Sequence, residues 1–208
     1  MTNSPFNMVY DQIIARGIKH HDIIKAMLKI DRKLFISEVH QKHAYKDCPL
    51  PIGYGQTISQ PYIVAYMMEQ LELTSQKTIL EIGTGCGYQT ALLAEICRRV
   101  YTMEILSPLL HQAQQRLSKQ GYTNIWYKNT DGYNGWKEYA PYDAIIVSAS
   151  PHHTPQQLIE QLADKGRMII PIKSHSQQHL IQYTKSCDQI THKELIAVRF
   201  VPLIHQTE

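Results

Sequence analysis

The stretch Thr78-Ile79-Leu80-Glu81-Ile82-Gly83-Thr84-Gly85-Cys86-Gly87-Tyr88 decides the fold. It opens with a short apolar run that one carboxylate interrupts, and it passes directly into three glycines at alternate positions. Apolar residues at helical spacing follow, from Ala91 to Ile96. Strand, glycine-rich turn and helix is the nucleoside- and phosphate-binding arrangement of open α/β sheets. Glycine suits such a turn because the chain needs positive φ there and a ligand must approach the bare backbone.

The chain after this turn continues in the same pattern. Residues 99–104 form a second strand-like run that ends in Glu104, about twenty residues after the glycines, where an acid meets ribose hydroxyls in dinucleotide-type folds. A third run, 124–129, leads to Asp131 and Gly132, another acidic turn at the carboxyl end of a strand. The sequence therefore places two acids beside the glycine turn.

These acids narrow the class of ligand. Tyr88 stands where a dinucleotide fingerprint has Gly or Ala, and a bulky residue there disfavours a pyrophosphate packed under the helix. No basic phosphate clamp lies near Glu104 or Asp131 in the sequence. Two acids suit a ligand with ribose hydroxyls, an exocyclic amine and positive charge. S-adenosylmethionine has all three, so the pattern favours it over NAD.

Composition limits the kind of protein. With 208 residues and 43% hydrophobic content, we expect one compact domain over residues 1–208. No run of about eighteen apolar residues occurs, and the first residues lack a basic region followed by an apolar core. We therefore expect neither a membrane span nor a secretory signal. The net charge is +3, but its lysines and arginines are dispersed, which disfavours a nucleic-acid groove.

Cysteines and histidines indicate neither disulfides nor a metal. The four cysteines are scattered without a C-x-x-C pair, so we expect reduced thiols in a cytoplasmic protein. The eleven histidines include the adjacent pairs His20-His21 and His152-His153, whose side chains diverge on a helix or strand. No H-E-x-x-H pattern or Cys/His quartet is present, so no metal site is expected.

The remaining patterns alternate between helix and strand. The pattern predicts two amphipathic helices that cover one face of the sheet, at residues 9–18 and 21–30. In the first, Val9, Ile13 and Ile14 lie on the apolar side. Further elements are a turn capped by Asp31, helices at 107–120 and from Thr154-Pro155, strands at 142–147 and 166–172, and runs at 180–184 and 190–201. The last two look like an antiparallel pair at the sheet edge. The pattern predicts a doubly wound α/β sandwich.

The segment 48–61 differs from the rest. Two prolines and two glycines exclude a regular helix or a central strand. The polar run 56–59 then precedes a helix beginning at Pro61, which places Ser59 or Gln60 at its cap. Ser59 is either a capping hydroxyl, worth roughly 1 kcal/mol, or a binding group in an ordered loop. Residue chemistry alone favours the cap.

Four stretches resemble one known family over nearly the whole chain. They are PIGYGQTISQP at 51–61, LEIGTGCGYQT at 80–90, PYDAIIV at 141–147 and AVRFVPL at 197–203. The second alone is typical of any class I methyltransferase, but the first and fourth together resemble the protein-L-isoaspartate O-methyltransferases. The resemblance implies a Rossmann-like sheet of seven strands, mostly parallel with an antiparallel edge, plus N-terminal helices. Within the domain it implies N-terminal helices and an active-site loop (1–60), a cofactor-binding half (76–150), and C-terminal strands with the substrate cleft (151–208).

The same resemblance implies an activity. Such an enzyme transfers a methyl group from S-adenosylmethionine to the free α-carboxylate of L-isoaspartyl residues in damaged proteins and peptides, and leaves S-adenosylhomocysteine. The ester then returns through a succinimide to normal L-aspartyl. We expect isoaspartyl proteins and peptides as partners, no nucleic acid or membrane, no metal, and a monomer.

Residue roles are carried over by position. Ser59 is expected to be catalytic and to contact the substrate carboxylate, while Glu104 holds the ribose and Asp131 with Gly132 the adenine. The full set expected to bind the cofactor is Thr57, Ile58, Glu81, Gly83, Thr84, Gly85, Gly87, Glu104, Asp131 and Gly132. The set expected to bind the substrate is Ser59, Val198, Phe200, Val201, Pro202 and Leu203. Cys86 stands where many relatives have serine, but it contributes mainly backbone.

Three alternatives remain open from the sequence. The first is a methyltransferase of the same fold that acts on RNA or a small molecule, which the loop at 51–61 and the dispersed basic charge disfavour. The second is a non-catalytic nucleoside-binding module, which Ser59 and the run at 197–203 disfavour. The third is an NAD-binding dehydrogenase, which Tyr88 disfavours.

Overall fold

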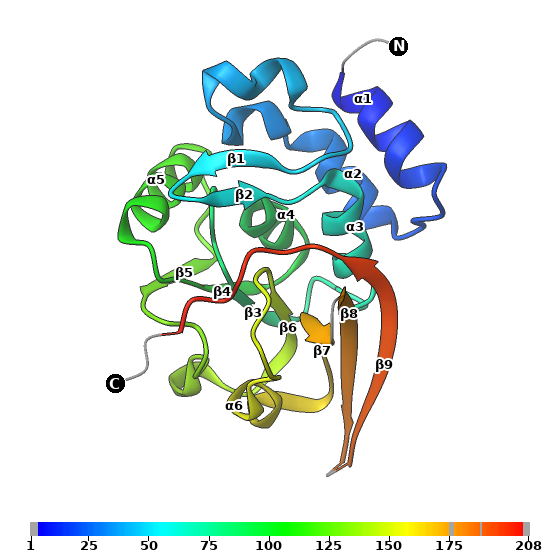
Figure 1. Ribbon diagram of the computed structural model, residues 1–208, viewed down its shortest axis with the longest axis vertical. Coiled ribbons are helices and arrows are strands. Elements are labelled where there is room, and N and C mark those ends of the chain that lie inside the picture. Colours follow the sequence, from blue (N-terminus) through cyan, green and yellow to red (C-terminus); the bar gives the residue numbers. More distant parts are fainter. Residues whose placement is uncertain (1–3, 175–176, 188, 206–208) are drawn as a thin grey trace.

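The computed structural model describes residues 4–174, 177–187 and 189–205. At its centre is a seven-stranded sheet with the strand order β5-β4-β3-β6-β7-β8-β9 (Figure 1). The strands are β3 (Thr78–Ile82), β4 (Arg99–Glu104), β5 (Ile125–Asn129), β6 (Tyr142–Val147), β7 (Leu162–Ser174), β8 (Gln177–Ser186) and β9 (Gln189–Val198). The strands from β5 to β7 are parallel, whereas β8 and β9 pair antiparallel. The expected mostly parallel sheet with an antiparallel edge is confirmed.

The strand order reverses at β3, which sets the position of a ligand site. From β3 the chain builds outward through β4 and β5, and then returns to add β6 on the other side. Every residue of β3 is buried, as in a parallel sheet covered on both faces. In open α/β sheets, ligands bind beyond the carboxyl ends of the strands at such a reversal.

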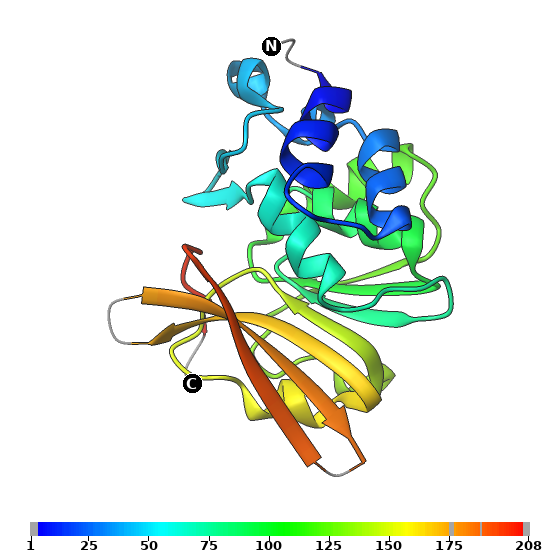
Figure 2. The ribbon, with the colours of Figure 1, turned by 90° about the vertical axis from the view of Figure 1, so that its right-hand side faces the viewer.

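The helices cover the two faces unequally. They are α1 (Pro5–Asn7), η1 (Met8–Ile14), α2 (His21–Lys29), η2 (Arg32–Phe35), η3 (Glu38–His43), α3 (Pro61–Glu69), α4 (Tyr88–Ile96), α5 (Ser107–Lys119), η4 (Lys137–Tyr139) and α6 (Gln156–Glu160). One core joins the N-terminal helices, α3 and α4 to one face of the sheet, and a second core lies between the other face and α6 (Figure 2). Within the described ranges, no helix is long and apolar enough to cross a membrane.

The segment expected to contain neither helix nor central strand forms a separate hairpin. Its strands, β1 (Leu50–Gly53) and β2 (Gln56–Ile58), pair with each other and with no other strand of the described residues. The hairpin lies over the carboxyl ends of the central strands (Figure 1). It leads directly into α3, so the polar run before that helix is held above the sheet.

The first helix differs from its prediction. Residues 8–14 form a π-helix, in which the Ala15 N–H donates to the Tyr10 carbonyl five residues earlier. Its wider turns keep Val9 and Ile13 buried but leave Ile14 41% exposed. Placing Ile14 on the apolar side was therefore wrong. The final strand also ends at Val198 instead of running to 201, because the chain there leaves the sheet.

A fully buried carboxylate lies in the middle of β3. Glu81 accepts hydrogen bonds from Gln89 Nε2 (3.0 Å), Thr90 Oγ1 (2.6 Å) and Thr102 Oγ1 (2.8 Å). These donors tie β3 to β4 and to α4. Burial raises the pKa of Glu81 to about 7, although the three hydrogen bonds oppose the shift.

The buried carboxyl of Glu81 predicts a pH-dependent stability. Because its pKa rises from 4.5 to about 7 on folding, the native state binds a proton that the unfolded chain releases. Protonated Glu81 therefore adds to the free energy of unfolding below pH 4.5, and this addition is lost as the pH rises to about 7. The loss amounts to roughly 3 kcal/mol.

Urea unfolding of the wild type and Glu81→Gln at pH 4.5 and 7.5 measures this effect. The wild-type free energy of unfolding, relative to that of the glutamine variant, should fall by roughly 3 kcal/mol between the two pH values. Other titrating groups cancel in the comparison. Equal pH dependence in the two proteins would contradict the account of Glu81.

Candidate active site

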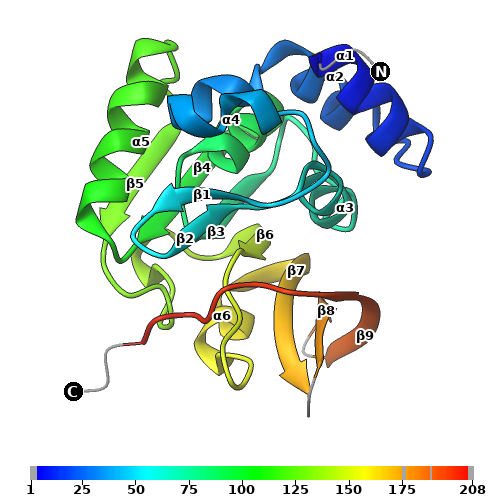
Figure 3. The ribbon, with the colours of Figure 1, turned by 45° about the horizontal axis from the view of Figure 1, so that its top comes forward.

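A cavity opens beyond the carboxyl ends of β3, β4 and β6, and we call it the inner cavity. Its walls come from the glycine loop (residues 83–87), the β1–β2 hairpin and the C-terminal segment (residues 199–205). Figure 3 shows the C-terminal segment (red) running from the end of β9 across the view, with the β1–β2 hairpin on one side and α6 on the other. The cavity therefore lies at the reversal of strand order.

The glycine loop brings bare backbone to the inner cavity. Gly83 and Gly85 line it with φ values of 97° and 54°, which L side chains rarely adopt. A Cβ on Gly83 would lie 3.4 Å from Ser148 Cβ, and one on Gly85 would lie 3.3 Å from Ile52 Cδ1. Side chains at these positions would be strained and would fill part of the cavity.

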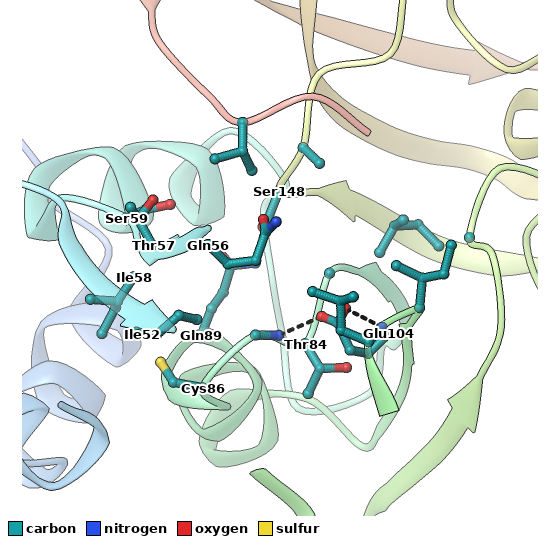
Figure 4. A pocket seen from close by; sticks show the side chains of 18 of the residues that line it. Ile52, Gln56, Thr57, Ile58, Ser59, Thr84, Cys86, Gln89, Glu104 and Ser148 are labelled. Carbon is teal, nitrogen blue, oxygen red and sulfur yellow. Dashed lines mark hydrogen bonds between the residues drawn. The ribbon is translucent and has the colours of Figure 1, made fainter. Parts of the chain in front are cut away.

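Glu104 is the only charged side chain among the described residues that line the inner cavity. Its carboxylate accepts hydrogen bonds from the Gly85 N–H at 2.9 Å and the Leu106 N–H at 3.0 Å (Figure 4). These bonds fix the side chain at the end of β4, and they leave lone pairs for further donors. A fixed acid with no basic partner in the lining suits hydroxyls and a positively charged ligand.

A second cavity, which we call the outer groove, lies between the C-terminal segment and the stretch that joins β2 to α3. Residues 197–201 form one wall, and Ser59, Gln60 and Ile63 contribute to another. Lys173 and Arg199 are the only charged residues among the described lining. Two cations without an acid favour an anionic ligand.

The two cavities share a boundary. Thr57, Ser59, Ser148 and Val201 line both of them, and we call these four residues the junction. A ligand in the inner cavity and a ligand in the outer groove meet only there.

Ser59 is not a helix cap. Gln60 occupies the N-cap position of α3, and its side chain makes no capping hydrogen bond. Instead, the Asp47 carboxylate accepts from the Tyr62 N–H at 3.3 Å and from Gln60 Nε2 at 2.8 Å. Within the described chain, no residue bonds the half-buried Ser59 hydroxyl. The capping interpretation is therefore wrong, and the hydroxyl is available to a ligand.

The C-terminal segment is fixed across the junction by two sets of bonds. The Ser150 N–H donates to the Val201 carbonyl (2.8 Å), and the Leu203 N–H donates to the Ser150 carbonyl (2.9 Å). The side-chain amide of Gln178 pairs with both backbone groups of Phe200, at 3.2 and 2.6 Å. These contacts hold residues 200–203 as a wall of both cavities.

Most of the residues predicted for the site are brought together. Those on the inner cavity are Thr57, Ile58, Ser59, Gly83, Thr84, Gly85, Glu104, Gly132, Val201, Pro202 and Leu203. Those on the outer groove are Ser59, Val198, Phe200 and Val201. Pro202 and Leu203, expected in the substrate cleft, lie on the inner cavity instead, because the C-terminal segment crosses from one cavity to the other.

Three predicted cofactor residues lie outside the inner cavity. Glu81 is fully buried in the sheet behind it. Gly87 is the N-cap residue of α4, and its missing side chain leaves room for α5, since a Cβ would lie 3.1 Å from Leu117 Cδ1. The carboxylate of Asp131 accepts from the Tyr133 N–H at 2.8 Å and contacts His205 Nδ1 at 2.5 Å. Sequence position alone does not show which way such side chains face.

Several residues of the site were missed by sequence reasoning. Asp47, Gln89 and Gln178 act through side-chain contacts with residues distant in the chain, and no motif marks them. Ser148 follows a predicted strand directly, at the edge where ligands bind, which is a signal that could have identified it. In the parts of the chain that the structure describes, no group of three or more His, Cys, Asp or Glu residues could hold a metal ion.

Comparisons with known proteins identify the family. Residues 4–208 match the family model described as Protein-L-isoaspartate(D-aspartate) O-methyltransferase (PCMT). A protein-L-isoaspartate O-methyltransferase of Picosynechococcus sp. is 52% identical over 196 residues, which are 94% of this chain and 88% of that protein. One of Desulfotalea psychrophila is 48% identical, over 95% of this chain and 92% of that protein.

Solved structures agree with the sequence relatives. A protein-L-isoaspartate O-methyltransferase structure superposes with a TM-score of 0.87 and 26% identity, over 96% of this chain and 65% of that chain. A Plasmodium falciparum protein, described as a putative member in complex with S-adenosyl-L-homocysteine, superposes with a TM-score of 0.85 and 27% identity, over 98% and 99% of the two chains. The chain therefore belongs to the protein-L-isoaspartate(D-aspartate) O-methyltransferase family and is an S-adenosylmethionine-dependent methyltransferase.

Proposed function

We propose that the inner cavity binds S-adenosylmethionine, that the outer groove binds the isoaspartyl peptide, and that the methyl group is transferred at the junction. The family's reaction methylates the α-carboxylate that is freed when an aspartyl linkage moves to the side chain. The observation that carries this assignment is that Thr57, Ser59, Ser148 and Val201 line both cavities. Two ligands held on either side of these residues are in contact.

The inner cavity suits the cofactor. S-adenosylmethionine, when bound, supplies a positively charged sulfonium methyl group. Glu104 would accept hydrogen bonds from the ribose hydroxyls, since its carboxylate is fixed and has lone pairs to spare. Gly83 and Gly85 would bring the backbone against the methionine end, and Gly132 would lie beside the adenine. The apolar remainder of the lining suits the ring and the methylene groups.

The substrate needs positioning and no acid or base. A free carboxylate with a pKa near 4 is already ionised at neutral pH, so no side chain has to remove a proton from it. The cations Lys173 and Arg199 raise the local concentration of the anionic substrate in the outer groove. What remains is to hold one carboxylate oxygen in line with the methyl carbon.

Ser59 supplies part of this positioning. Its hydroxyl has no partner among the described residues, so it is free to donate to one oxygen of the carboxylate. No histidine or carboxylate of the described chain forms a hydrogen bond with it, so none of these residues activates it as a nucleophile. Ser59 therefore orients the substrate and forms no covalent intermediate.

We also propose that the enzyme works as a cytoplasmic monomer on isoaspartyl proteins and peptides, without nucleic acid. The described cysteines Cys48, Cys86, Cys97 and Cys187 are all free thiols, as suits a reducing compartment. The described lining of the outer groove has only two basic residues, whereas nucleic acids are bound by clusters of them.

A pair of peptides tests the function itself. Labelled S-adenosylmethionine is incubated with the enzyme and a peptide that carries either an isoaspartyl or a normal aspartyl residue at one position. Label should enter only the isoaspartyl peptide, because only there is an α-carboxylate free at the modified residue. Equal labelling of both peptides, or of neither, would refute the proposal.

Ser59→Ala tests the junction. The variant should bind S-adenosylhomocysteine as the wild type does, while kcat/KM for the isoaspartyl peptide falls roughly ten- to a thousand-fold, the effect of one lost hydrogen bond to a charged group. Ser118→Ala, on the exposed side of α5, serves as the matched control. Normal turnover by Ser59→Ala would remove Ser59 from the active site.

Glu104→Gln tests the cofactor assignment. The amide keeps the shape of the side chain but loses its charge and leaves either the Gly85 or the Leu106 N–H without its acceptor. Affinity for S-adenosylhomocysteine, measured by calorimetry, should fall at least roughly tenfold. Glu160→Gln, at an exposed position of α6, is the control. Unchanged affinity in Glu104→Gln would exclude Glu104 from the ribose site.

A further inference from the structure

We propose that Ser148 is a second residue that contacts the substrate, and that its hydroxyl donates a hydrogen bond to the isoaspartyl carboxylate alongside Ser59. This inference rests on the proposed placement of the two ligands. Ser148 follows β6 directly, and its N–H donates to the Ile82 carbonyl at 2.9 Å, which fixes its backbone to the central strands. Its half-buried side chain lies at the junction of the two cavities.

The contact with Gln89 orients the Ser148 hydroxyl. Gln89 Nε2 donates to Ser148 Oγ at 2.9 Å and to Glu81 Oε1 at 3.0 Å. Figure 4 shows the side chains of Gln89 and Ser148 next to each other. The amide nitrogen of Gln89 lies between these two oxygens and donates to both, so Glu81 and Ser148 together fix the orientation of the amide. The Ser148 oxygen therefore accepts. Its own O–H has no acceptor among the described residues, and it is left to donate toward a ligand.

Gln89 is in turn held from the protein interior. The carboxylate of Glu81, to which Gln89 donates, is fixed by Thr90 and Thr102 at 2.6 and 2.8 Å. A buried carboxylate is unfavourable unless it is well bonded, and this one sets the direction of an amide that reaches the junction. Hydrogen bonds thus connect Glu81 in the core to Gln89, and Gln89 to Ser148 at the junction. In functional sites, such supporting residues hold the side chains that contact the ligand.

Space at Ser148 is also restricted. A Cβ on Gly83 would lie 3.4 Å from Ser148 Cβ, so the glycine loop packs closely against this side chain. The hydroxyl is confined by Gln89 on one side and by the loop on the other. A confined donor loses little conformational entropy when it bonds a ligand.

Two neutral donors suit this reaction better than one cation. A carboxylate offers four lone-pair sites on two oxygens, and one oxygen must stay free to attack the methyl carbon. Hydroxyls of Ser59 and Ser148, which approach from the loop after β2 and from the end of β6, can fix both the position and the tilt of the group. A cation at the same place would bind the attacking oxygen more strongly and reduce its nucleophilicity. The cations Lys173 and Arg199 are exposed in the outer groove instead.

Ser148→Ala and Ser148→Cys test the hydrogen bond. Cysteine keeps the shape of serine but is a weak donor. Both variants should lower kcat/KM for the isoaspartyl peptide roughly five- to a hundred-fold. Affinity for S-adenosylhomocysteine and the melting temperature should stay close to those of the Ser118→Ala control. Wild-type kcat/KM in either variant, or a loss explained by weaker cofactor binding, would overturn the proposal.

A double-mutant cycle tests whether Gln89 acts through Ser148. Gln89→Met, which keeps the length of the side chain and removes its donors, should lower kcat/KM several-fold in the wild type but little further in Ser148→Ala. Equal effects in both backgrounds would show that Gln89 supports the fold alone, and would overturn the positioning role. Loss of activity in Ser59→Ala with full activity in Ser148→Ala would refute only this inference. A wild type that does not methylate the isoaspartyl peptide would refute the proposed function itself.

Discussion

The backbone pairing of Ser150 with Val201 and Leu203 is the constraint on which the active site depends. It carries the C-terminal segment across the carboxyl ends of the central strands, so one piece of chain forms a wall of both cavities. The antiparallel strands β8 and β9 deliver the chain to that point, and Gln178 fixes it at Phe200 where it leaves the sheet. Without this crossing, the inner cavity and the outer groove would share only the hairpin and the end of β6.

The charges of the two cavities are complementary to their proposed ligands. The inner cavity has one carboxylate and no cation among its described lining, whereas the outer groove has two cations and no acid. Each ligand is thus attracted to its own side, and the neutral junction lies between them. In the proposed mechanism the carboxylate is already ionised and no proton has to move, so the protein contributes geometry. On this proposal, the two serines of the junction serve to position the carboxylate.

Much of the fold followed from the sequence, because the central strands are continuous apolar runs and the glycines mark the turn. The strand ending in Glu104 and the helix after Ser107 were predicted within about one residue. The role that the resemblance gives to Ser59 stays a prediction, and Ser59 lines both cavities. Side-chain direction was the main failure. A short sequence pattern does not show which way an acidic side chain points. Glu81 faces the core, and Asp131 contacts His205 of the C-terminal segment. Contacts across 59 residues, such as that of Gln89 with Ser148, leave no local pattern at all.

A crystal structure of the enzyme with S-adenosylhomocysteine and an isoaspartyl peptide tests the central claim most directly. We expect the cofactor product in the inner cavity with its ribose on Glu104, the peptide in the outer groove, and the free carboxylate between Ser59 and Ser148, facing the sulfur. A product molecule bound away from the glycine loop, or a carboxylate held by neither serine, would contradict it.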